Sequence, residues 1–161
     1  MLAAQVANGG HRVRPYLVES VRDLEGHVVM RRGVEGQTGT LGLPPSEIQQ
    51  LRDAMEACVM DAGGTGYAAR VPGIRIAGKT GTAQNPHGLD HAVFMGYAPA
   101  DDPRIALAIV IENGGHGASA AAPVARRVIA ALLAPQALTA EERAGTDSTA
   151  ASAPVDTSAA D

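Results

Sequence analysis

The sequence is poor in the side chains that most often carry metal, redox or nucleic-acid chemistry. Its 161 residues include one cysteine, no tryptophan, one phenylalanine and three tyrosines. A single cysteine, Cys58, excludes an internal disulfide and a thiolate-rich metal cluster. A core must therefore be built mainly from alanine, valine, leucine and isoleucine, and the apolar fraction of 45% is enough for one domain.

Charge and long apolar runs are scarce as well. The formal net charge is -4, and residues 1–134 are balanced, with 12 acids and 12 bases. A neutral body without a basic stripe disfavours nucleic acid as a partner. No run approaches the roughly 20 apolar residues of a transmembrane helix, and Met1 is not followed by a signal-peptide pattern. We predict no membrane segment in this chain.

The N-terminal part combines a helix end with an extended excursion. Leu2 to Ala7 is typical of the last turns of a helix, closed by the glycines that follow Asn8, because glycine accepts the left-handed conformation there. Residues 13–31 alternate loosely between apolar and polar, with a turn at Glu25 and Gly26, and predict an extended excursion or a hairpin.

An amphipathic helix is predicted over residues 46–62. Ser46 can cap it, and Gln49 three residues later completes a capping box. Apolar positions then recur at three-to-four-residue spacing, which indicates a helix packed on one face; they are Ile48, Leu51, Met55, Cys58 and Val59. We expect the Cys58 thiol to be buried and inert on this face.

Three strand-like segments follow, at residues 74–83, 91–98 and 104–111. Their connections are too short for crossover helices, so an antiparallel meander is expected. A last helix is predicted over residues 119–133, with Ser119 as its cap. These elements predict an α+β fold with an antiparallel sheet meander.

Residues 73–80 match the P-loop pattern G-x-x-x-x-G-K-[ST], so nucleotide binding is an alternative. A P-loop needs an apolar strand before its first glycine and a helix that begins at the lysine. Here Ile74 and Ile76 alternate like a strand inside the supposed loop, and Gly81 and Pro86 interrupt the supposed helix. The order of elements therefore disfavours a phosphate site.

The same segment has a different chemistry when it forms a strand. Gly78 and Gly81 remove side chains from a sheet edge, so that an extended peptide can pair with the backbone. Lys79, Thr80 and Thr82 offer a cation and two hydroxyls that can hold a peptide carboxylate, while a free backbone amide can face an oxyanion. The alternative is an edge strand with an exposed lysine and no ligand.

The run from Lys79 to Gln84 resembles the Lys-Thr-Gly signature of penicillin-binding proteins and serine β-lactamases. The flanking segments resemble, in order and spacing, the end of class B transpeptidase domains, and the loop 112–117 is most similar to elongation-type members; the segments are 91–99, 101–104, 109–117 and 122–127. The resemblance implies the family's fold, an antiparallel sheet flanked by helices in αβα layers. It assigns residues 1–134 to the C-terminal portion of a transpeptidase domain. Residues 135–161, rich in Ala, Ser, Thr, Pro and acids, are expected to form a disordered tail.

The resemblance implies a function for the strand. In that family a serine attacks the penultimate D-alanine carbonyl of a peptidoglycan stem peptide, and an amine from another stem resolves the acyl-enzyme. Lys79 would then contribute positive charge and assist proton transfer, and Thr80 and Thr82 would bind the terminal carboxylate. The Thr82 amide would supply half of the oxyanion hole, and Gly81 would keep the strand open. Stem peptides and β-lactams are the implied ligands, with no metal or cofactor.

The family's other signatures are missing. No serine lies three residues before Lys79, as the Ser-x-x-Lys nucleophile motif requires, and no Ser-x-Asn occurs. We expect both upstream, in an N-terminal half that is this chain's partner, and we expect the chain alone to be inactive. The resemblance implies a parent protein anchored in the bacterial cytoplasmic membrane, with this domain outside and a cell-wall glycosyltransferase as a further partner. A non-catalytic scaffold on the same fold and a serine β-lactamase fragment are the alternatives.

Other polar residues are assigned no chemistry. His87 and His91 are four apart but separated by a turn, so no metal site is predicted. His116 lies in a glycine-rich loop, where exposure to solvent is expected, and it is left out of the site. Asp101 and Asp102 are typical of a turn.

Overall fold

The computed structural model describes residues 1–32, 39–140 and 142–143, and its centre is a three-stranded antiparallel sheet. The strands β3 (Ala77–Ala83), β4 (His91–Ala98) and β5 (Ile105–Ile111) lie in the order β3-β4-β5, which confirms the predicted meander. The helices are α1 (Leu2–Ala7), α2 (Pro45–Met60) and α3 (Ala122–Leu133), with short helical turns η1 (Tyr67–Ala69), η2 (Gly117–Ala121) and η3 (Pro135–Ala137).

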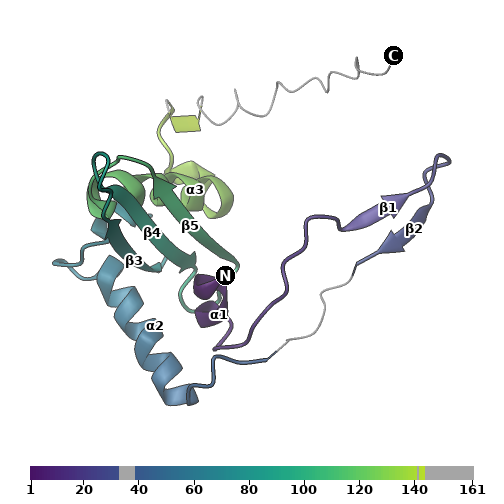
Figure 1. Cartoon of the computed structure of the whole chain (residues 1–161), viewed down its shortest axis with the longest axis horizontal. Coiled ribbons are helices and arrows are strands. Elements are labelled where there is room, and N and C mark those ends of the chain that lie inside the picture. The colour runs from purple at the N-terminus through teal and green to yellow at the C-terminus, as the bar shows by residue number, and fades with distance from the viewer. Residues whose placement is uncertain (33–38, 141, 144–161) are drawn as a thin grey trace.

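Helices cover both faces of this sheet, so the predicted αβα layering is confirmed (Figure 1). On one face the buried ring of Phe94 packs with the alanine-rich side of α3 and η2. On the other face Tyr97 packs with Val6 of α1 and Met55 of α2. Because successive residues of a strand point to opposite faces, one strand contributes to both cores.

The single phenylalanine explains two of the glycines in the sheet. A methyl group at Gly78 would overlap the ring of Phe94, and one at Gly96 would overlap the Ala77 carbonyl and lie 3.0 Å from the same ring. Gly78 is buried and serves this packing. Its role therefore differs from the open strand edge that the sequence suggested for it.

Helix α2 begins without the predicted capping box. It starts at Pro45, and no side chain caps its first turn. Proline suits this position because its missing N–H would have no helical partner. Gln49 instead donates from Nε2 to Asp53 Oδ1 at 2.7 Å, and Cys58 is only half-buried rather than buried.

The last helix begins three residues later than predicted, after the π turn η2. Ser119 lies within that turn and donates from Oγ to the carbonyl of His116 at 3.2 Å, so it is not the helix cap. Gly117 at the start of this turn lies close against β3 and β4, since a methyl group there would overlap the carbonyl oxygens of Gly81 and Val93. This contact holds the chain in a turn before the helix can start.

The packed chain continues beyond residue 134, where the composition changes. Leu138 is buried in the α3 core, and Arg126 donates to Glu142 Oε1 at 2.6 Å. The backbone amide of Thr139 and then Arg126 hold the pKa of Glu142 below its ordinary value. Packing against α3 thus continues into the first residues of the expected tail, and residues 144–161 lie outside the described residues.

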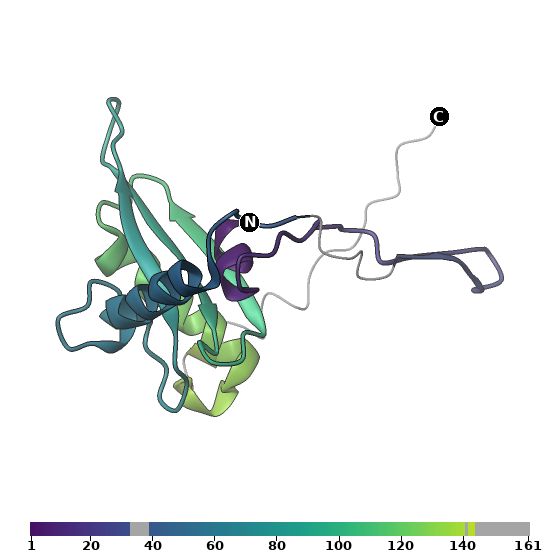
Figure 2. The same cartoon turned by 90° about the horizontal axis from the view of Figure 1, so that it is seen from below.

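The predicted hairpin stands away from the body as an arm, seen in both views (Figures 1 and 2). Strands β1 (Ser20–Arg22) and β2 (Val28–Arg31) pair antiparallel, and Gly26 in their connection has φ +89°. The side chains of β2 are exposed. No helix in the described ranges is long and apolar enough to cross a bilayer.

A buried hydroxyl in the second core leads to a stability prediction. Tyr97 is fully buried, and its phenol oxygen has no hydrogen-bond partner among the described residues. Burial raises the pKa of this phenol, and the nearby Arg52 guanidinium opposes that shift only in part. The guanidinium carbon of Arg52 lies 5.9 Å from the ring centroid, but Arg52 donates its hydrogen bond to the Ala100 carbonyl and not to the phenol oxygen. Because an unpaired buried hydroxyl is costly, we expect Tyr97→Phe to raise the unfolding free energy by about 1 kcal/mol.

Urea denaturation of the chain measures this difference, with Tyr67→Phe as the matched control. Tyr67 is 53% exposed, so loss of its hydroxyl should leave the midpoint unchanged. A lower midpoint for the Tyr97 variant would show that its hydroxyl has a partner after all.

Candidate functional site

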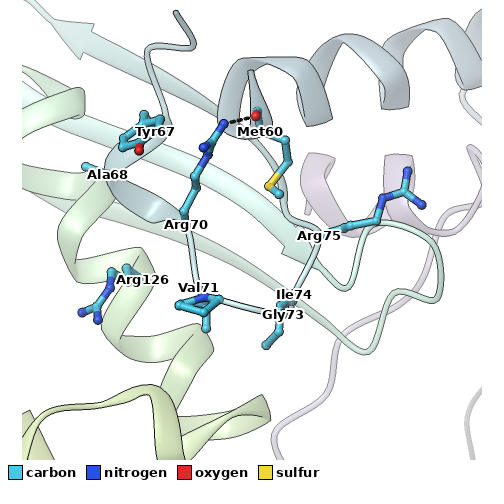
Figure 3. Close-up of a pocket in the computed structure, with 10 residues that line it drawn as sticks. Met60, Tyr67, Ala68, Arg70, Val71, Gly73, Ile74, Arg75 and Arg126 are labelled. Atoms are coloured by element: carbon cyan, nitrogen blue, oxygen red, sulfur yellow. Dashed lines mark hydrogen bonds between the residues drawn. The ribbon is translucent and has the colours of Figure 1, made fainter. Parts of the chain in front are cut away.

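One hollow among the described residues is lined by arginines that already have structural partners (Figure 3). It measures about 740 Å³ and lies between the end of α2, η1 and the loop that leads to β3. Arg70 donates to the last carbonyls of α2, including Met60. Arg75 pairs with Glu56 at 2.7 Å, and Arg126 pairs with Glu142. These three cations are thus engaged by groups of the chain itself.

A second hollow, of about 400 Å³, lies along β3 and contains the motif singled out in the sequence. Within the described ranges β3 is an edge strand, paired on one side with β4. All four predicted site residues line the hollow, together with a loop residue and the start of η2; the lining residues are Thr65, Lys79, Thr80, Gly81, Thr82, His116, Gly117 and Ala118.

The side chain of Lys79 is exposed and lies along its own strand, toward the next residue. Its Nζ donates to the carbonyl of Thr80 at 2.6 Å. Lys79 also lines a neighbouring apolar groove of about 290 Å³ between α1, α2 and the sheet, where Met55 and Met95 lie. The one lysine of the chain therefore stands between a polar hollow and an apolar one.

The two threonines of the strand share one face because they are two residues apart. Thr80 is half-buried and Thr82 is exposed. Along a strand, the backbone N–H and C=O groups of residues two apart point to the same edge. The N–H of Thr82 therefore points to the same edge of β3 as the Thr80 carbonyl, which accepts from Lys79. Between them Gly81 lies opposite Val93, with no side chain to block the strand.

Sequence reasoning missed two residues of this hollow. The Nδ1 atom of His116 lies 3.5 Å from Thr82 Oγ1, so this exposed histidine lines the site from which it was left out. Thr65 is hydrogen-bonded to Thr80 although it precedes it by 15 residues. Its one sequence signal is the pair of glycines on either side, which is equally typical of an ordinary loop.

The remaining polar residues have local partners. His91 accepts at Nδ1 from the Asn113 amide at 3.0 Å. Asp101 lies 4.0 Å from Arg75. In the part of the chain that the structure describes, no three His, Cys, Asp or Glu side chains gather as a metal site would require.

Comparison with known proteins decides the family. The sequence profile of the penicillin binding protein transpeptidase domain matches residues 1–130. The chain belongs to this family. It is 36% identical over 143 residues to the peptidoglycan D,D-transpeptidase PbpA of Mycolicibacterium smegmatis, covering 82% of this chain and 28% of that protein. It is also 36% identical over 136 residues to MrdA of Acinetobacter baumannii, covering 75% of this chain and 20% of that protein.

Solved structures of the family share the fold. The D,D-transpeptidase domain of a peptidoglycan glycosyltransferase from Eggerthella lenta superposes with a TM-score of 0.73 at 36% identity, covering 84% of this chain and 31% of that one. Penicillin-binding protein A of Mycobacterium tuberculosis, solved as a ceftriaxone acyl-enzyme complex, gives a TM-score of 0.72 at 35% identity, with 82% and 31% covered. The names of the relatives confirm the class B, elongation-type resemblance, and this chain spans less than a third of their length.

Proposed function

We propose that this chain is the substrate-binding part of a longer peptidoglycan D,D-transpeptidase, which binds D-Ala-D-Ala stem peptides and is acylated by β-lactams. The observation that carries the proposal is the hollow along β3, where one ammonium and two hydroxyls line a strand edge. A stem peptide ends in a carboxylate on an extended backbone, and it needs both a cation and a strand to pair with.

Each group of the hollow then has a role. The hydroxyls of Thr80 and Thr82 donate to the terminal carboxylate, and Lys79 supplies positive charge and assists proton transfer. The Thr82 amide donates to the oxyanion that forms when the penultimate carbonyl is attacked, which is the kind of contact that lowers such barriers most. Gly81 leaves room for the peptide backbone beside the strand.

The nucleophile comes from outside these 161 residues. Ile76, not serine, lies three residues before Lys79. The apolar groove beside Lys79 supports an upstream segment that packs there and brings its serine to the lysine. In the intact protein the domain lies outside the cytoplasmic membrane, to which an upstream segment anchors it, and a cell-wall glycosyltransferase supplies the glycan strands.

Labelling with fluorescent penicillin tests the function. Membranes of the source cell are labelled, and the protein is captured with an antibody raised against residues 144–161. A labelled band well above 16.4 kDa is expected. An unlabelled band near 16.4 kDa would instead indicate a short non-catalytic scaffold. The isolated chain should gain no penicillin-sized mass in intact-mass spectrometry.

A further inference from the structure

The loop between α2 and η1 is built to place one side chain against β3. A methyl group at Gly64 would overlap the carbonyl of Cys58, and one at Gly66 would lie 3.0 Å from Val59 Cγ2. The Gly66 amide donates to the Cys58 carbonyl at 2.9 Å. Only glycines allow the loop to fold this closely over the end of α2, and Thr65 between them is carried to the hollow.

Thr65 joins the hollow through a chain of hydrogen-bonding groups. The hydroxyl of Thr80 donates to Thr65 Oγ1 at 2.8 Å, and Cys58 Sγ lies 3.3 Å from the same oxygen. Each hydroxyl can both donate and accept, and a thiol is a weak donor. The donors and acceptors of these hydrogen bonds can therefore exchange roles without any heavy atom moving.

We propose that Thr65 is a positioning residue for the carboxylate contact of Thr80. The inference rests on the proposed function. A carboxylate only accepts hydrogen bonds, so Thr80 must turn its proton from Thr65 to the ligand. Thr65 then donates to the oxygen that Thr80 has freed, and the Cys58 thiol donates to Thr65. Each bond polarises the next, which strengthens the contact with the charged ligand.

The other threonine of the strand has no such support within the described residues. Thr82 is exposed, and its Oγ1 lies 3.5 Å from His116 Nδ1, the outer limit for a hydrogen bond. Thr80 is half-buried and has a hydroxyl partner at a short distance. The geometry therefore makes Thr80 the better-oriented donor and Thr65 the group that orients it.

The test compares two probes in the full-length protein that carries this segment. Penicillin G has a free carboxylate, and its methyl ester does not, so the ratio of their acylation rate constants reports the carboxylate contact. We expect Thr65→Val to lower this ratio about tenfold, as loss of support for one charged hydrogen bond would. Thr65→Ser restores the hydroxyl and should return the ratio to the wild-type value.

A second pair of variants shows whether Thr65 acts through Thr80. Thr80→Val alone should lower the ratio, and adding Thr65→Val to it should have no further effect, because coupled residues are not additive. Thr65→Ala, smaller at an exposed position, repeats the test if the valine variant does not fold.

An unchanged ratio in the Thr65→Val protein would overturn the inference, and so would an equal loss of rate with both probes, since that is the result of a structural role. Wild-type protein that neither probe acylates would overturn the proposed function itself. These results are distinguishable in one experiment.

Discussion

Replacing Lys79 by methionine is expected to lower the rate of β-lactam acylation of the intact protein by about 100-fold or more. A preorganised charge or donor at the reacting centre contributes on the order of 10² to 10³ in rate, and methionine keeps the length of the side chain but not its charge. Lys79 is the only lysine among these 161 residues, so the variant removes the one ammonium that this segment contributes to the hollow.

The acylation rate constant is measured with a fluorescent penicillin and quantified on gels. Arg127→Met is the matched control, because Arg127 is an exposed cation on α3 that does not line the β3 hollow. Its removal should leave the rate unchanged. Equal rates for the Lys79 variant and the wild type would exclude Lys79 from the proposed site.

The second large effect concerns the fold, at Gly117. A methyl group there would overlap backbone oxygens of both β3 and β4, at Gly81 and Val93. Backbone atoms of paired strands cannot shift as a flexible side chain can, so η2 must lift from the sheet. We expect Gly117→Ala to lower the unfolding free energy by about 3 kcal/mol, at the upper end for overpacked sites.

Chemical denaturation of the chain measures the loss. Gly63→Ala is the control, because a methyl group there meets no atom within 4 Å. We expect its midpoint to match the wild type. If Gly117→Ala had the same midpoint too, η2 would not rest on the strands as the structure has it. A normal fold combined with weaker penicillin acylation would instead assign Gly117 to the site alone.

The elements with a clear local pattern were predicted well. Strand β4 has the predicted bounds, because its short flanking turns are rich in glycine, proline and aspartate. Helix α2 was predicted from its apolar spacing, and the error at its start came from a competing signal: Ser46 and Gln49 look like a capping box, but Pro45 starts the helix one residue earlier.

The errors near the site have a common cause in packing. Local signals favour a helix from Ser119, but contact of Gly117 with two strands delays it. The composition after Pro135 likewise gives no sign that Leu138 is buried in the α3 core. Neither contact has a local signature, because each partner lies far away in the chain.

The sequence by itself determined the family, the order of the strands and the presence of a cation and two hydroxyls on one strand. Those features depend on spacing along the chain, where alternation in a strand sets which side chains share a face. Only the tertiary structure decided what surrounds that strand: Thr65 beside Thr80, His116 beside Thr82, and the apolar groove beside Lys79. The reason is physical, since residues that lack a periodic pattern are brought together by close packing of loops and helices on the sheet.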